Sequence, residues 1–207
     1  MGYKRNQVEE AIAKVYPPEA RSSFPLTNGL KRLLDTDRRL GRKRSSNAEI
    51  STYAFFPQEP PGQGFDVEFG EYDAFALLVG VQMLYHGFPQ QDVVKTLRRV
   101  RASLKTEHSR ILSLNHKDLF DQEELRRSVR SGQPAYKTTK PSFLVVRTHR
   151  GHPHETADVH LCKDEAELMR TVKSQFNPCT IFELVARAHP LHNALQSTEP
   201  RPRGRSA

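Results

Sequence analysis

Residues 71–87, EYDAFALLVGVQMLYHG, constrain the fold of this chain more than any other stretch. Apolar side chains lie on nearly every side of the helix that these residues would form. A helix that is apolar all round is buried in a protein core, so the rest of the chain must supply elements that surround it. Gly87 is positioned to cap this helix, because a glycine just past the last turn adopts the left-handed conformation without steric cost.

A further helix is predicted directly after this break, in the stretch YHGFPQQDVVKTLRRVR (85–101). Pro89 suits its first turn, where the missing N–H does no harm. Apolar residues at helical spacing form a core-facing stripe: Val93, Leu97, Val100 and Leu104. The arginines lie mostly off that stripe, and we therefore expect Arg98 and Arg99 to face solvent.

Two more helices are predicted upstream, over residues 6–16 and 26–40. Pro17 and Pro18 end the first one. Leucines at helical spacing make the apolar stripe of the second: Leu26, Leu30, Leu33, Leu34 and Leu40. Gly41 fits a C-terminal cap of this helix.

Between residues 50 and 70 the apolar residues no longer recur at helical spacing. ISTYAFF (50–56) is rich in aromatic and β-branched residues, and GFDVEFG (64–70) alternates between apolar and acidic residues. The segment between them, PQEPPGQG, is typical of a turn, so the stretch predicts a β-hairpin. We expect Tyr53, Phe55 and Phe56 to form the core of this hairpin rather than to stack on bases.

The character of the chain shifts again beyond residue 117. DQEELRRSVR predicts a short helix and RSGQPAYKTTKP a linker. SFLVVRT, ADVHLC and CTIFELVA predict strands, with helices at 164–176 and 189–196. The predicted class is therefore α+β, with a small α/β domain at 140–197. The predicted organisation is an N-terminal region of helices and a hairpin at 1–117, a helix and linker at 118–139, the α/β domain at 140–197 and a disordered basic tail at 198–207.

The charge balance favours an acidic partner. The formal net charge is +8 and the sequence pI is about 9.7, which is typical of proteins that meet nucleic acid, an anionic surface or an acidic protein. No apolar run approaches the roughly 20 residues that a membrane span needs. We therefore expect a cytoplasmic protein with no membrane partner, in which Cys162 and Cys179 are reduced.

The order of these elements resembles the N-terminal DNA-binding domain of MerR-type regulators. In that family a helix-turn-helix is followed by a hairpin wing and by a second helix pair whose junction often reads Gly-Phe-polar. The matching stretches are NQVEEAIA, LKRLLDTDRRLG and EYDAFALLVGVQMLYHGFPQQDVVKTL. The resemblance covers residues 3–105. It implies a winged helix-turn-helix fold, double-stranded DNA as the partner, a homodimer, and transcriptional regulation as the role.

A helix-turn-helix protein places one helix in the major groove and holds the backbone with basic side chains. On the reading helix these would be Lys31, Arg32, Arg38 and Arg39. Phosphate contacts would come from Lys4, Arg5, Arg42, Lys43 and Arg44, and from Arg98 and Arg99 of the fourth helix. Two alternatives stay open: a solvated basic helix face, and an adaptor that uses this face to bind an acidic protein or RNA.

No catalytic or metal constellation is expected. The chain has no GxSxG, no P-loop and no GxGxxG after a strand. The stretch HRGHPHETADVHLC carries residues of metal-ligating chemistry: His149, His152, His154, His160 and Cys162. Their spacing fits no zinc pattern. We therefore predict a His-rich hairpin loop, no cofactor and no enzymatic activity.

Overall fold

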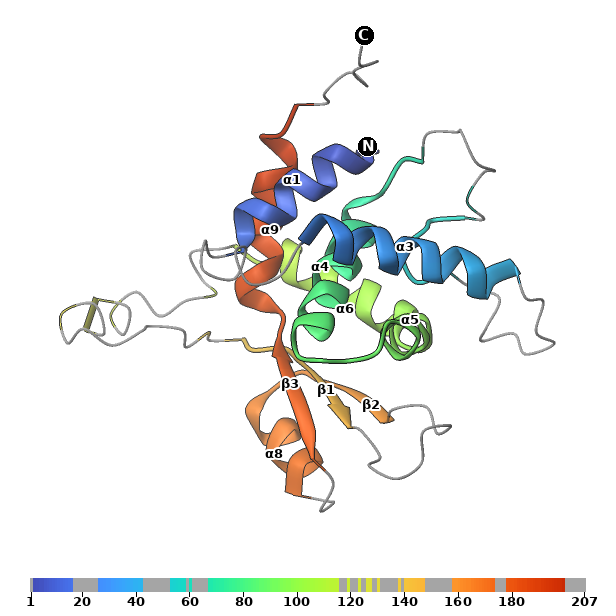
Figure 1. The fold of residues 1–207 in the computed structure, drawn as a ribbon. Coiled ribbons are helices and arrows are strands. Elements are labelled where there is room, and N and C mark those ends of the chain that lie inside the picture. The colour runs from blue at the N-terminus through green and yellow to red at the C-terminus, as the bar shows by residue number, and fades with distance from the viewer. Residues whose placement is uncertain are drawn as a thin grey trace, which may run out of the picture. The chain divides into compact units, whose positions relative to one another are not determined.

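The computed structural model describes residues 2–16, 26–42, 53–58, 60, 67–115, 119, 123, 126–127, 130, 138, 140–147, 158–173 and 178–199. These residues form seven helices and one three-stranded antiparallel sheet, so the predicted α+β class is confirmed (Figure 1). The chain divides into two compact units, Met1–Arg101 with Pro190–Ala207, and Ala102–His189. The domain boundaries expected from the sequence stay a prediction. None of the described helices is long and apolar enough to cross a membrane.

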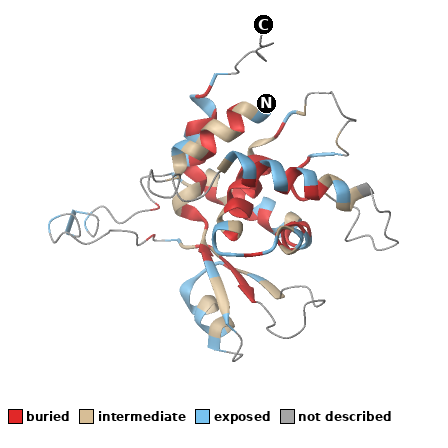
Figure 2. Ribbon diagram, in the orientation of Figure 1, coloured by how far each residue is buried: buried red, intermediate tan, exposed pale blue. Residues whose placement is uncertain are grey.

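The first unit is built around helix α4 (Glu71–Tyr85), as its all-round apolar pattern predicts. Residues 72–81 and Met83 are buried, and Figure 2 shows α4 buried along nearly its whole length. Helices α1 (Arg5–Val15) and α3 (Leu26–Arg42) both pack against it, and α5 (Gln90–Arg99) packs against α3 and α4. The leucine stripe of α3 is buried where it meets them. Gly41 lies inside α3, so the expected cap at this glycine is wrong.

The junction between α4 and α5 follows the prediction closely. Gly87 has φ +84°, in the left-handed region that favours glycine. Its N–H donates to the Leu84 carbonyl at 2.9 Å, and the Phe88 N–H donates to the Met83 carbonyl at 3.1 Å. These two bonds form a Schellman motif, which satisfies the last carbonyls of α4. Pro89 precedes α5 as its N-cap, one position before the first turn where we expected it.

The fourth predicted helix is two helices. α5 ends at Arg99, and α6 (Arg101–Ser113) begins after Val100, whose ψ of 3° breaks the regular geometry. The predicted stripe of Val93, Leu97, Val100 and Leu104 is buried throughout.

The predicted β-hairpin is not confirmed in the residues that the structure describes. Tyr53–Phe56 form no strand, with a bend at Ala54 and Phe55, and Phe69 makes a single antiparallel bridge, with Tyr3. The reason is that side chains take the backbone groups that a strand ladder would need, as described below for Asp37 and Arg101. Phe55 and Phe56 are fully buried, so their predicted place in the core is confirmed. Most of the expected turn (57–64), at 59 and 61–64, lies outside the described residues, as do residues 65 and 66 of the expected second strand.

The second unit contains the sheet β2-β1-β3, in which β1 (Phe143–Arg147) pairs antiparallel with β2 (Asp158–Cys162) and β3 (Cys179–Glu183). Helix α8 (Glu165–Lys173) packs against β2, and the Asp164 side chain accepts the Glu167 N–H at its start, as its capping position predicts. The three predicted strands and this helix are confirmed. The short helix expected at 121–130 lies largely outside the described residues.

Helix α9 (Val185–Gln196) begins earlier than predicted. The Glu183 carboxylate accepts the N–H groups of Val185 and Ala186, each at 2.8 Å, and this cap ends the strand and starts the helix. After α9, Thr198 is buried, and its carbonyl accepts a hydrogen bond from Gln7 at 2.7 Å. The predicted disorder of the tail is therefore wrong at Thr198, and residues 200–207 lie outside the described part of the chain.

Candidate nucleic-acid interface

Helix α3 has one buried and one exposed side. The buried side, which packs against α4 and α5, consists of Leu30, Leu33, Leu34, Thr36 and Asp37. The exposed side consists of Thr27, Asn28, Lys31, Arg32, Asp35 and Arg39. We call these six residues the α3 face. Three of them are basic, one is acidic and two are neutral polar, so the face combines phosphate-binding charge with groups that hydrogen-bond base edges.

The structure separates the basic residues that the sequence groups on this helix. Lys31, Arg32 and Arg39 are exposed, as expected. Arg38 is half-buried, because its guanidinium lies 5.3 Å from the centre of the Phe56 ring. A cation over an aromatic face is held there by the ring quadrupole, so Arg38 contributes to packing and the expectation that it is fully exposed is wrong.

The predicted phosphate contacts outside α3 have different surroundings. Lys4 and Arg5 are exposed at the start of α1, where Arg5 pairs with Glu9 at 2.7 Å. Arg99 is exposed on α5, four residues after the exposed Lys95. The Arg42 side chain and the residues Lys43 and Arg44 lie outside the described part of the chain.

Arg98 is the main correction to the predicted interface. Its side chain is 4% exposed, and its guanidinium pairs with Asp37, which is fully buried. Arg98 Nε lies 2.8 Å from Asp37 Oδ1, and Nη2 donates to the Asp37 carbonyl at 2.6 Å. The expectation that Arg98 faces solvent is wrong, because a buried carboxylate on the neighbouring helix requires a cation beside it.

Asp37 also binds the segment at 53–56. Its carboxylate accepts the N–H of Ala54 at 3.2 Å and of Phe55 at 3.0 Å. Burial raises the pKa of Asp37 above its ordinary value, while Arg98 and the two amides act in the opposite direction. The carboxylate therefore links α3, α5 and the irregular segment in one buried network.

Arg101 completes this network from the other side of the segment. It donates to the carbonyls of Tyr53 at 2.6 Å and Ala54 at 2.7 Å, and pairs with Asp73 of α4 at 2.9 Å. The sequence analysis missed both arginines as structural groups. The position of Asp37 contained the relevant information, since it lies four residues after Leu33 and seven after Leu30, on the apolar stripe of the helix. A carboxylate placed there is buried and must be paired.

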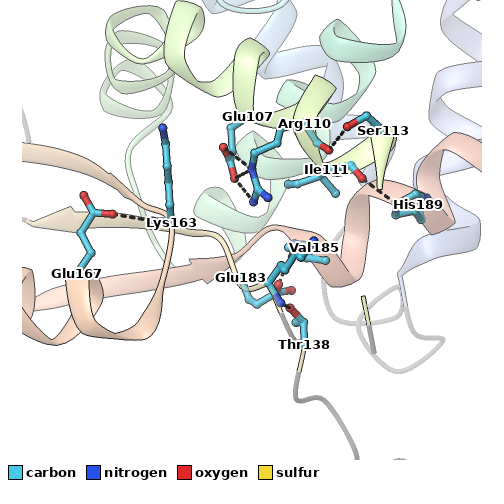
Figure 3. Close-up of polar contacts among 11 residues, drawn as sticks. Glu107, Arg110, Ile111, Ser113, Thr138, Lys163, Glu167, Glu183, Val185 and His189 are labelled. Carbon is cyan, nitrogen blue, oxygen red and sulfur yellow. Dashed lines mark hydrogen bonds and ion pairs between the residues drawn. The ribbon is translucent and has the colours of Figure 1, made fainter. Parts of the chain in front are cut away.

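The second unit has a separate polar cluster around Glu107 of α6 (Figure 3). The Glu107 side chain is 2% exposed and accepts three hydrogen bonds from Arg110, at 2.6, 3.0 and 3.1 Å. Burial alone would raise the pKa of Glu107, but the hydrogen bonds from Arg110 lower it below its ordinary value. On the same helix the Ile111 carbonyl lies 3.0 Å from His189 Nε2. These contacts fix α6 within its unit.

The histidine-rich stretch shows one described contact of note: His160 Nε2 lies 2.8 Å from Asp158 Oδ2. His149, His152 and His154 lie outside the described residues. In the part of the chain that the structure describes, no three His, Cys, Asp or Glu side chains come together as metal ligands.

The two cysteines are free thiols. Cys162 pairs in register with Phe143 and Cys179 with Arg147, which places them on the two outer strands at opposite ends of β1.

No protein-family model, curated protein or solved structure matches this chain. The assignment of a function therefore depends on the α3 face and on the charge of the chain.

Proposed function

We propose that this protein is a DNA-binding transcriptional regulator in which α3 is the reading helix of a MerR-like helix-turn-helix. In this arrangement α1 and α3 form the helix-turn-helix, and α4 and α5 form the second helix pair. The proposed partner is double-stranded DNA, bound by a cytoplasmic homodimer. The observation that carries the proposal is the α3 face, which presents Lys31, Arg32 and Arg39 on a helix whose opposite side is anchored in a core.

The anchoring supports this role because a reading helix must keep its orientation when it enters the groove. The Asp37–Arg98 pair fixes α3 to α5 at 2.7 Å, and the Thr36 hydroxyl donates to the Gln90 side chain at 3.3 Å. The major groove is about 12 Å wide and admits one α-helix. The 17 residues of α3 are long enough to cross it while Leu30, Leu33 and Leu34 stay buried.

The polar residues of the α3 face match the chemistry of base edges as well as phosphates. Arginine pairs with guanine and asparagine with adenine, while a carboxylate accepts a hydrogen bond from the cytosine amino group. Arg32, Asn28 and Asp35 are the residues of these types on the face. Lys31 and Arg39 are the best phosphate ligands among its exposed residues, with Lys95 and Arg99 of α5 as further candidates.

The test is the affinity for duplex DNA of a Lys31→Glu/Arg39→Glu variant as a function of salt. Log affinity falls with log salt by about 0.9 per phosphate contacted, so loss of two contacts should reduce that slope by about 2. Both side chains are exposed, so the melting temperature should stay near that of the parent. The matched control is Lys105→Glu/Arg170→Glu, which makes the same charge change on exposed residues of α6 and α8.

We expect the control to bind DNA nearly as the parent does. Equal loss in both variants would show that binding follows net charge rather than the α3 face. Tighter binding to a single-stranded RNA or to an acidic peptide than to duplex DNA would replace the proposal with the adaptor alternative. Light scattering tests the homodimer separately, and a monomeric chain would contradict that part of the proposal.

A further inference from the structure

A pocket of about 220 Å³ opens in the first unit, between the start of α3 and the turn that joins α4 to α5. Its lining consists of Asn28, Gly29, Arg32, Leu84, Phe88, Pro89 and Gln90. The α4–α5 turn supplies the apolar part of the lining, through Leu84, Phe88 and Pro89. The Schellman motif at Gly87 holds this part in place, because it closes the turn directly in front of Phe88.

The polar part of the lining consists of hydrogen-bond donors. Gln90 already accepts the Thr36 hydroxyl through its side-chain oxygen, which leaves its amide nitrogen to donate. Among the described residues, neither the Arg32 guanidinium nor the Asn28 side chain has a hydrogen-bond or ion-pair partner. Arg32 is the ionised residue of the lining, so the pocket has positive charge at one end and hydrocarbon at the other.

We infer that this pocket binds a small organic acid, namely a ring or short hydrocarbon that carries one carboxylate. The carboxylate pairs with Arg32, whose planar guanidinium suits a two-oxygen acceptor, and the hydrocarbon covers Leu84 and Phe88. A cavity of about 150 Å³ holds a benzene ring, so this pocket of about 220 Å³ has room for one ring and a carboxylate.

The same ligand would regulate DNA binding, a step that rests on the proposed function. Arg32 belongs both to the lining of the pocket and to the α3 face. A guanidinium paired with a carboxylate is no longer available to a guanine or a phosphate, so an occupied pocket weakens DNA binding. A ligand that competes for one shared side chain lowers the affinity for DNA, and DNA lowers the affinity for the ligand by the same factor.

The binding site is tested without DNA, by titrating sodium benzoate into the full-length chain and following the NMR signals of the Leu84 methyls and the Gln90 side-chain amide. We expect saturable shifts with a Kd on the order of 1 mM, as is usual for a ligand of so few atoms. Benzyl alcohol, which has the same ring without the charge, should bind the parent at least about tenfold more weakly. This comparison requires no protein variant.

Arg32→Gln should weaken benzoate binding by about tenfold or more, because it removes the charge of the carboxylate's partner. Lys31→Gln is the matched control: it removes a charge from the adjacent exposed residue, which does not line the pocket, and should leave the Kd unchanged. Three results would each overturn the site: no saturable shift at about ten times the expected Kd, equal binding of benzyl alcohol, or equal losses in the two variants.

The regulatory step is tested by measuring DNA affinity with benzoate at saturation and with sodium chloride at the same ionic strength. With benzoate at saturation, we expect the parent protein to bind DNA no more tightly than the Arg32→Gln variant does. The DNA affinity of Arg32→Gln itself should not change when benzoate is added. Benzoate binding with unchanged DNA affinity overturns the regulatory step and leaves the site. If the chain binds no DNA under any condition, both the regulation of DNA binding and the proposed function are overturned. The NMR titration then still tests whether the pocket binds an organic acid.

Discussion

Replacing Arg98 by Gln tests whether the buried pair with Asp37 holds the first unit together. The change keeps a side chain of moderate length but removes the charge that faces a fully buried carboxylate. It also removes the bond from Nη2 to the Asp37 carbonyl at 2.6 Å. The carboxylate then keeps only the two amide donors of Ala54 and Phe55 among its present partners.

The expected loss in the free energy of unfolding is about 3–5 kcal/mol, the cost of leaving one partner of a buried ion pair uncompensated. The free energy of unfolding of an ordinary domain is about 5–15 kcal/mol, so this single change removes about a fifth of the total or more. Arg99→Gln is the matched control. Arg99 is the next residue of the same helix but is exposed, and its replacement should change stability by about 0.5 kcal/mol or less.

Urea denaturation followed by circular dichroism and tyrosine fluorescence measures both losses; the chain has six tyrosines and no tryptophan. The double variant Asp37→Asn/Arg98→Gln should be more stable than the sum of the single losses predicts, by about 0.5–3 kcal/mol. A loss in Arg98→Gln below about 1 kcal/mol, similar to that in Arg99→Gln, would refute the role assigned to the pair.

The dependence of stability on pH provides a second test of the Arg98→Gln variant. Burial holds the pKa of Asp37 above its ordinary value, with Arg98 opposing it, so the folded state binds this proton at a higher pH than the unfolded chain. Protonation of Asp37 therefore favours the folded state. The contribution of this group to the free energy of unfolding rises as the pH falls from its folded-state pKa toward its pKa in the unfolded chain, about 3.9. Without Arg98 the pKa of Asp37 rises further. The difference in unfolding free energy between the parent and Arg98→Gln should therefore narrow as the pH is lowered from neutral.

Three other changes have expected outcomes in the same denaturation assay. Gly87→Ala should lose about 1 kcal/mol through backbone strain alone, since φ is +84° and no atom lies within 4 Å of the added Cβ; Gly87→Asn should lose less. Gly80→Ala should lose about 1–3 kcal/mol by overpacking, because its Cβ would meet three side chains at 3.1, 3.2 and 3.3 Å. Glu107→Gln should lose about 1–3 kcal/mol at neutral pH. The pKa of Glu107 is lowered in the folded state: burial opposes this shift, but the hydrogen bonds and charge of Arg110 produce it. Its contribution is therefore present above the unfolded pKa and is lost on acidification, so the variant should respond less to pH below about 4.5.

Much of the regular structure could be predicted because its causes are local. The all-round apolar pattern of residues 71–85 predicts a buried helix in any globular context, and α4 is that helix. Gly87 is the residue that a left-handed cap favours, and its conformation follows from that local requirement. The three strands of the second unit also follow from short apolar runs between turn-forming residues.

The β-hairpin predicted at residues 50–70 is not confirmed, because the strand pattern of these residues competes with contacts from elsewhere in the chain. Phe55 and Phe56 have the strand propensity that the prediction used, and both are buried. The backbone of the preceding residue, Ala54, is however bound by side chains that lie 17 residues before it and 47 residues after it in the chain. β-propensity measures the fit to a pleated, half-buried surface, and tertiary contacts override it where they offer the backbone other partners.

The sequence by itself determined which residues are apolar, where the helices break and that the chain is basic. Only the tertiary structure decided which of the arginines are available to a partner. Arg98 and Arg99 are adjacent and chemically identical, yet one is buried against Asp37 and the other is exposed. The difference arises because a charge enters a core only beside an opposite charge, and the position of that second charge is set by how α3 packs on α5.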